Sequence, residues 1–168
     1  MNRLSTVPYN REAALSYAKT WSLSRNPKYY DFSEIGGDCT NFISQCIYAG
    51  CHTMNPTQYV GWYYYNVNNR SASWTGVPFF YKFMINNKGV GPYMVEVPSP
   101  ADLLPGDVIQ FANPGQDWHH NLLVLQTGPR YEDVLIATHT NDAYNRPLST
   151  YNFAKIRFLH IENIRRYS

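Results

Sequence analysis

The last third of the sequence differs in character from the first third, and this change constrains the fold more than any other feature. Residues 10–50 carry two apolar patterns with helical spacing, whereas the last third holds short runs with strand-like patterning. Those strand-like runs cover 108–111, 121–127, 134–138 and 155–161. Because Gly128-Pro129 predicts a turn between the second and third runs, we expect these two to form an antiparallel hairpin. Helices followed by an antiparallel sheet predict an α+β fold.

Two helices are predicted before residue 51. Asn10 is the expected N-cap of the first helix, which should end near Arg25 because Pro27 follows. The second helix should begin at Asp38 or Cys39 and end at Gly50, and its continuous apolar stripe predicts a buried position. Residues 52–100 are rich in Tyr, Trp, Asn, Gly and Pro, which favours loops and one short helix over 78–86 rather than a sheet.

Length and charge limit the classes of protein. The 168 residues suit one domain over 1–168, in which 1–8 are expected to be flexible. A net charge of +2 without a Lys/Arg run argues against a nucleic-acid partner, and no apolar run is long enough for a membrane span. The first eight residues lack the apolar core of a signal peptide, so the localisation stays open between the cytoplasm and export through a signal further upstream. We expect a monomer.

Cys39 is the candidate nucleophile. It follows Gly-Gly-Asp and opens the second helix, where unpaired amides and the helix dipole favour a thiolate. The Gly pair allows the backbone to approach a substrate closely. The alternative is a small apolar residue at a helix start. The three Cys and five His have no zinc-site spacing, so neither a metal nor another cofactor is expected.

His120 is the candidate base. It alternates with Leu122 and Val124, and we expect this face of the strand to point toward the helices, with His119 pointing away. Centring the hairpin near Arg130 places 139–141 opposite His120. His139, and after it Asn141, are then predicted to orient the imidazole, with Asp142 as a further alternative.

The same segments resemble a known family. The stretch "DCTNFISQ" over 38–45 resembles the nucleophile motif of CHAP and NlpC-like cysteine peptidases, and "LLPGDVIQF" and "HNLLV" resemble the two strands that follow it there. From Tyr9 to about Ile161 the chain is similar to the bacterial putative-amidase domain family of that superfamily. The resemblance implies a papain-like fold with N-terminal helices packed on a C-terminal antiparallel sheet, a Cys-His-polar triad without metal, and bacterial cell-wall peptides as substrate.

The expected chemistry is hydrolysis of an amide through an acyl-enzyme on Cys39, with the amide at the helix start and the neighbouring Asp38 supporting the oxyanion site. The aromatic segment with Trp62, Tyr63 and Trp74 resembles the variable substrate face of the family. Two alternatives use the same fold: an acyltransferase or transglutaminase with an amine in place of water, and a non-catalytic module that binds cell-wall polymer.

Overall fold

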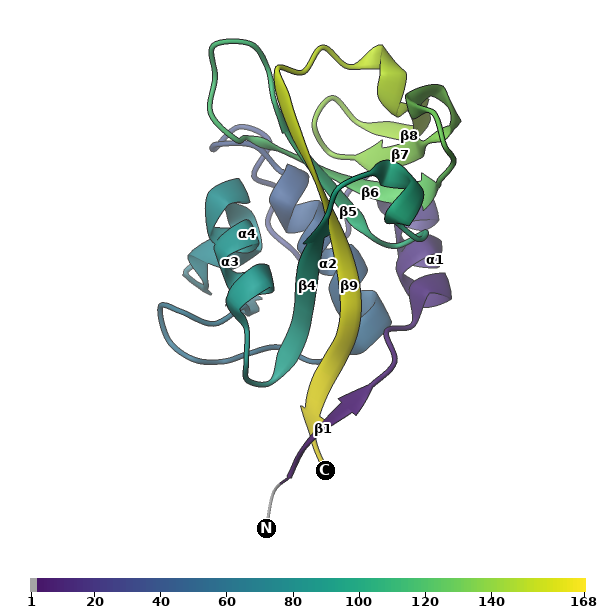
Figure 1. The fold of residues 1–168 in the computed structure, drawn as a ribbon. Helices are drawn as coiled ribbons and strands as arrows, with labels where there is room; N and C mark the ends of the chain where they lie inside the picture. Colours follow the sequence, from purple (N-terminus) through teal and green to yellow (C-terminus); the bar gives the residue numbers. More distant parts are fainter. Residues whose placement is uncertain (1–2) are drawn as a thin grey trace.

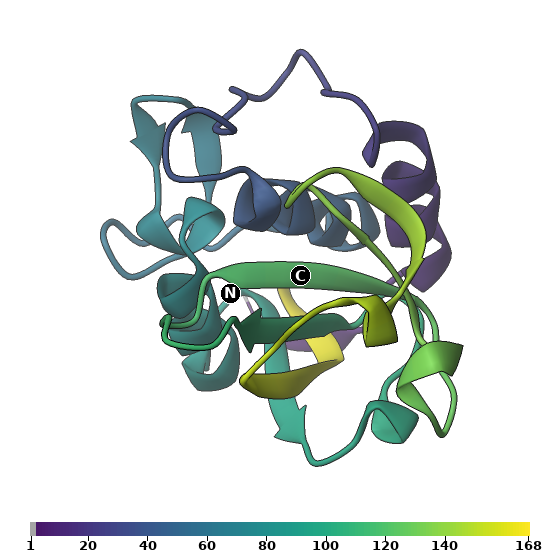
Figure 2. The same ribbon diagram turned by 90° about the horizontal axis from the view of Figure 1, so that it is seen from above.

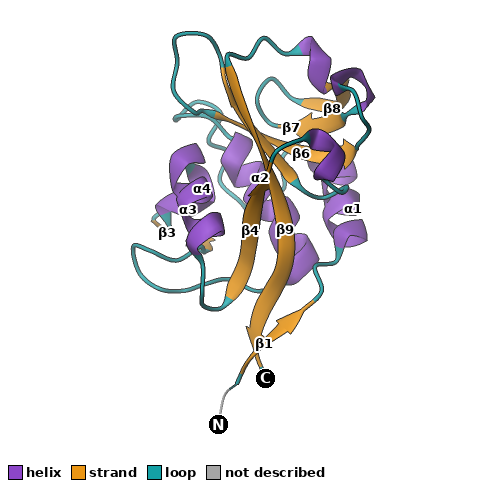
Figure 3. Ribbon diagram, in the orientation of Figure 1, coloured by secondary structure: helices purple, strands orange, loops and turns teal. Residues whose placement is uncertain are grey.

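The computed structural model describes residues 3–168, and a sheet of seven antiparallel strands forms its centre (Figures 1 and 3). The order of the strands is β1-β9-β5-β6-β7-β8, and β4 pairs with the free side of β9. The strands of this sheet are β1 (Leu4–Val7), β4 (Gly91–Val97), β5 (Val108–Ala112), β6 (His120–Gln126), β7 (Leu135–Thr138), β8 (Ala143–Pro147) and β9 (Lys155–Tyr167). The helices are α1 (Arg11–Trp21), α2 (Cys39–Cys51), α3 (Ala72–Thr75) and α4 (Val77–Asn86), and β2 (Tyr64–Asn66) and β3 (Asn69–Arg70) form a separate small hairpin.

The predicted α+β class is confirmed, and so are most of the predicted elements. The four expected strands correspond to β5, β6, β7 and the first half of β9, and the three expected helices correspond to α1, α2 and α4. The expectation of no sheet strand over 52–100 is wrong, because β4 pairs with β9 along its whole length. Within residues 1–8, which were expected to be flexible, Leu4–Val7 pair with β9 as β1; Met1 and Asn2 lie outside the described residues.

α2 is the central helix: it packs on the sheet, with α1 on one side of it and α3 and α4 on the other (Figure 2). Its side chains Phe42, Ile43, Cys46 and Ile47 are fully buried in a core shared with strand residues of the sheet. Gly50 does not end this helix, which continues to Cys51. A Cβ at Gly50 would lie 2.5 Å from the Tyr9 ring, so the glycine allows the chain before α1 to pass close to α2.

A second core lies on the other face of the sheet. Leu122 and Val124 of β6 pack there with Ile109 and Phe111 of β5 and with residues of the 3-10 turns, whereas Leu123 belongs to the core that contains α2. The sheet is therefore buried on both faces near β5 and β6, and side chains that alternate along β6 enter two different cores.

The Pro-Gly-Asp turn before β5 joins α1 to the sheet. Asp107 is fully buried, and its carboxylate accepts hydrogen bonds from Arg11 Nη1 at 2.8 Å, His160 Nδ1 at 2.7 Å and two backbone amides. The Tyr9 hydroxyl donates to the Gly106 carbonyl at 3.0 Å. These bonds fix α1 against the start of β5 and thereby help to hold the helical layer in place.

Candidate active site

Cys39 is the first residue of α2, as the sequence predicts, and its side chain is 6% exposed. The loop before it turns through Gly36 and Gly37, whose φ angles of 80° and 99° lie in the left-handed region that favours glycine. Nothing lies within 4 Å of a Cβ placed on either glycine, so the loop leaves open space beside the thiol. The Sγ atom contacts the Thr40 hydroxyl at 3.9 Å and the His119 carbonyl oxygen at 3.7 Å.

Asp38 holds this loop to the helix. Its Oδ1 accepts hydrogen bonds from the Phe32 amide and from Asn41 Nδ2, both at 2.9 Å. Its Oδ2 lies 2.5 Å from Nδ1 of His139 and 3.4 Å from Nε of Arg25. A fully buried carboxylate requires such partners, so Asp38 fixes the position of Cys39 through its own side chain.

His139 is therefore a structural partner of Asp38 in this structure and does not orient His120. Its Nε2 lies 2.8 Å from the Trp21 carbonyl oxygen, and its ring stacks on Phe42 with the centroids 4.1 Å apart. Arg25 completes this group, because it donates to both oxygens of Asp142 at 2.7 and 3.0 Å and lies 3.2 Å from His139 Nε2. The network joins the end of α1, the start of α2 and the turn after β7.

The partners of His120 differ from those predicted. Its Nε2 lies 2.9 Å from Oδ1 of Asn113, and its Nδ1 lies 3.3 Å from the Thr140 hydroxyl. Asn113 Nδ2 donates to the Asn152 carbonyl, which fixes the amide so that Oδ1 faces the imidazole. His120 then carries its proton on Nε2, and Nδ1 can accept one.

The predicted register is confirmed, but the side-chain directions drawn from it are wrong. Leu123 pairs with Ala137, so Thr140 lies opposite His120 when this register is extended. Residues directly opposite on antiparallel strands point to the same face, which brings Thr140 rather than His139 or Asn141 next to His120. β7 ends at Thr138, and Asn141 has a φ of 47° in the turn that follows.

The predicted face of β6 is also wrong. His120 shares a face with Leu122 and Val124, but this face carries the second core, and the His120 ring stacks on Phe111 with the centroids 4.4 Å apart. The side of β6 toward α2 carries Asn121, whose Nδ2 donates to the Thr40 hydroxyl at 2.9 Å. The sequence prediction assumed one core, whereas the sheet has a core on each face.

Cys39 and His120 nevertheless line one cleft. His120 is the first residue of β6, and this end of the strand opens beside the start of α2. The cleft has a volume of about 420 Å³ and is lined by residues from the loop before α2, the start of β6 and the turn after β7: Arg25, Ser33, Gly36, Gly37, Asp38, Cys39, His119, His120, His139, Thr140, Asn141 and Asp142.

His119 lies against His120, and the two ring centroids are 3.8 Å apart. His119 Nδ1 donates to the Asp117 carbonyl oxygen at 2.6 Å, and its Nε2 lies 3.1 Å from the same Asn113 oxygen that His120 uses. Burial and the neighbouring His119 lower the pKa of His120 from 6.5 to about 4. His120 is therefore neutral near pH 7, which is the form that can accept a proton.

The other two thiols are less suited to reaction. Burial raises the pKa of Cys46 well above its ordinary value, and it raises the pKa of Cys51 to about 12. Neither residue lines the cleft.

The aromatic residues predicted to form a substrate face lie in the core. Trp62 and Trp74 are fully buried, and Tyr63 is 7% exposed. The two indole N–H groups donate to Ser44 Oγ at 3.0 Å and Asn41 Oδ1 at 3.1 Å, respectively. These rings therefore support the first turns of α2, and the prediction that they contact substrate is wrong.

Asn113 and Thr140 are the residues of this site that sequence reasoning missed. Thr140 could have been found, because the register was correct and only the rule for opposite residues was misapplied. Asn113 carries no sequence signal of its own. It lies just after β5, in the segment that leads to β6, and only the path of this segment brings it to the imidazoles.

Two further features concern metals and membranes. Within residues 3–168, no three His, Cys, Asp or Glu side chains are grouped so that they could hold a metal ion. None of the helices in the same range is both long enough and apolar enough to cross a membrane.

Comparison with known proteins gives a family. A protein-family profile described as a putative amidase domain matches residues 8–161. The uncharacterized protein YhbB of Bacillus subtilis (strain 168) is 38% identical over 140 residues, which cover 82% of this chain and 43% of YhbB. The chain thus spans less than half the length of that relative, and no solved structure matches it. Because the profile covers nearly all of the chain, the protein belongs to the putative amidase domain family.

Proposed function

We propose that this protein is a cysteine-dependent amide hydrolase with a papain-like arrangement, in which Cys39 is the nucleophile and His120 is the base. The observation that carries the proposal is the shared cleft, which is lined both by a thiol at the start of a buried helix and by an imidazole held by an amide oxygen. Membership of an amidase family supports the same class of reaction.

Three features favour Cys39 as the nucleophile. The first amides of α2 have no partners within the helix, and together with the helix dipole they stabilise negative charge on sulfur. The Gly36-Gly37 turn leaves room for a substrate carbonyl. The Asp38 network holds the residue before the thiol, so the nucleophile has a fixed position.

The hydrogen bonds of the two imidazoles favour His120 over His119 as the base. Within residues 3–168, the hydrogen-bond partner of His120 Nδ1 is the Thr140 hydroxyl, which can donate, so Nδ1 can stay unprotonated and act as an acceptor. His119 Nδ1 faces a carbonyl oxygen, which only accepts, so this nitrogen must carry a proton. We assign Asn113 the orienting role, since its oxygen fixes the proton on Nε2 of His120.

In the proposed reaction, His120 takes the Cys39 proton and the thiolate attacks the amide carbonyl carbon. The resulting oxyanion is stabilised by free amides at the start of α2. The C–N bond then breaks as His120 returns the proton to the leaving amine, which gives a thioester. Water attacks the thioester with His120 as the base, and the acid product and the free thiol are released.

The substrate that we propose is a peptide or amide of the bacterial cell wall. The support for it is the resemblance of the Cys and His segments to CHAP and NlpC-like peptidases. Mass spectrometry of digested peptidoglycan would identify the bond, and adding an amine would separate hydrolysis from acyl transfer.

The test compares Cys39→Ala, His120→Ala and His119→Ala with the unmodified protein. We expect Cys39→Ala to abolish turnover, and His120→Ala to lower kcat by about 10²–10⁴-fold, the usual contribution of a general base. His119→Ala should be much milder. Turnover by a folded Cys39→Ala protein would overturn the hydrolase proposal, and a greater loss in His119→Ala would move the base to His119.

A further inference from the structure

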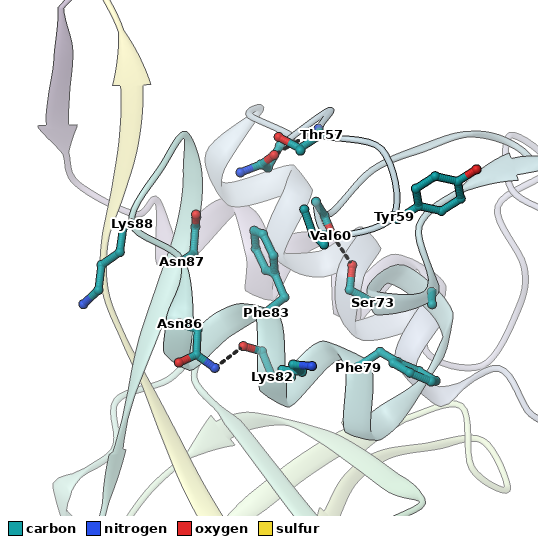
Figure 4. Close-up of a pocket in the computed structure, with 13 residues that line it drawn as sticks. Thr57, Tyr59, Val60, Ser73, Phe79, Lys82, Phe83, Asn86, Asn87 and Lys88 are labelled. Carbon is teal, nitrogen blue, oxygen red and sulfur yellow. Dashed lines mark hydrogen bonds between the residues drawn. The ribbon is translucent and has the colours of Figure 1, made fainter.

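A second cavity lies away from the thiol, between α4 and the loop that follows α2 (Figure 4). Its volume is about 520 Å³, and it shares no lining residue with the cleft at Cys39. Thr57, Tyr59 and Val60 line it from the loop, and Lys82 and Phe83 line it from α4. The loop begins at the C-terminal end of α2, whereas Cys39 is the first residue of that helix.

Apolar surface is exposed at this cavity. Tyr59 is 84% exposed, Val60 is 71% exposed and Phe79 is 55% exposed, while Phe83 is 8% exposed beneath them. Figure 4 shows Tyr59 and Phe79 at the same side of the cavity, on the loop and on α4. Exposed apolar side chains at the rim of one hollow indicate a surface for a ligand with an apolar face.

The cavity also carries positive charge. Lys82 and Lys88 are lining residues, and neither forms an ion pair with any residue over 3–168. No Asp or Glu lines the cavity. By contrast, Lys155 elsewhere on the surface lies 3.4 Å from Asp117. The two ammonium groups therefore favour an anionic ligand.

Polar groups at the cavity can bind hydroxyls. Asn86 Nδ2 donates to the Lys82 carbonyl at 2.8 Å, and the amide oxygen remains exposed to accept (Figure 4). The hydroxyls of Thr57 and Tyr59 form no hydrogen bond with the part of the chain that the structure describes. The cavity thus combines rings, hydroxyls, an amide oxygen and two ammonium groups.

We propose that this cavity binds a glycan with carboxylated sugar rings. The aromatic rings would stack on the apolar face of a sugar, the hydroxyls and the amide would bind its hydroxyl groups, and Lys82 and Lys88 would bind the carboxylates. An acidic peptide fits less well, because the lining residues lie on helices and loops and offer no strand edge for main-chain hydrogen bonds. This inference does not depend on the proposed reaction at Cys39.

The test is a calorimetric titration of the full chain with three probes: tetragalacturonate, the neutral sugar chitotetraose and hexaglutamate. We expect tetragalacturonate to bind and the other two to bind at least about tenfold more weakly. Lys82→Gln with Lys88→Gln should weaken tetragalacturonate binding about tenfold or more, and so should Phe79→Ala. The matched control is Lys19→Gln with Lys28→Gln, two exposed lysines away from the cavity, which should leave binding unchanged.

Each other outcome overturns the proposal. Equal binding of chitotetraose would remove the role of the carboxylates, and stronger binding of hexaglutamate would make the cavity a peptide site. Failure of tetragalacturonate to bind, or equal losses in the control variant, would exclude a glycan site here. All the substituted side chains are exposed, so the fold should persist, and circular dichroism checks it.

Discussion

Replacing His139 with Ala separates the structural role that we assign to this residue from an orienting role in catalysis. His139 is buried against Asp38, and the side chains of the pair are 2% and 0% exposed. Removing a partner of a buried carboxylate costs about 3–5 kcal/mol. Asp38 keeps Arg25, the Phe32 amide and Asn41, so we expect the lower end, about 3 kcal/mol. For a chain of this size that corresponds to a fall in Tm of roughly 6–12 °C.

The assay is urea unfolding followed by tryptophan fluorescence, with turnover measured on the same samples below the transition. Asn141→Gly is the matched control, because it lies in the same turn, has a φ of 47° that glycine tolerates, and should change stability by less than about 0.5 kcal/mol. A double-mutant cycle with Asp38→Asn should give a coupling of about 1–3 kcal/mol between the two positions.

If His139→Ala unfolds at the same urea concentration as the unmodified protein but has lost turnover, His139 acts on the reaction and not through Asp38. The structural role that we infer from the 2.5 Å contact would then be wrong.

Three other predictions follow from burial. Burial and His119 lower the pKa of His120 to about 4 in the folded protein, whereas the unfolded chain takes up this proton near pH 6.5. The free energy of unfolding should therefore fall as the pH drops from 6.5 to 4. Urea midpoints of His120→Gln, measured over the same pH range, should show a smaller fall. Iodoacetamide should label Cys39 before Cys46 and Cys51 in the folded protein, as peptide mapping by mass spectrometry would show; faster labelling of Cys51 would contradict the assignment. Gly50→Ala should destabilise the fold by about 1–3 kcal/mol in urea, because the added Cβ would lie 2.5 Å from the Tyr9 ring and 2.6 Å from the Asn10 carbonyl oxygen; an unchanged midpoint would mean that both move aside easily.

Local patterns predicted the elements that carry strong periodicity. The apolar stripe of α2, the N-cap at Asn10 and the Gly128-Pro129 turn are local signals, and the corresponding helices and hairpin are present. The sequence patterns did not predict β1 and β4, because β1 has only four residues and β4 begins with Gly91-Pro92, which is typical of a turn. Both strands are formed by pairing with β9, which is a tertiary effect that a local pattern does not reveal.

The site was predictable in its position and less so in its contacts. The helix-start location of Cys39 and the strand location of His120 followed from the residues, and the structure brings both to one cleft. The hydrogen-bond partners of Cys39 and His120 depend on which face of the sheet packs against α2 and which face carries the second core. With a core on both faces, the alternation of β6 did not decide the side on which α2 lies, and Asn113 came from a loop whose path the sequence does not specify.

The long final strand has a consequence for how the chain reaches its native state. β9 is hydrogen-bonded to β1, β4 and β5, so three strands depend on residues 155–167, and β1 pairs with them across nearly the whole sequence. Such high contact order slows folding, because the cost of closing long loops precedes the gain from pairing. During synthesis, the edges of β4 and β5 that pair with β9 therefore stay unpaired until residues 155–167 emerge, and the core that contains α2 lacks Leu159, Ile161 and Ile164 until then. Unpaired strand edges and incomplete cores make such intermediates prone to aggregation.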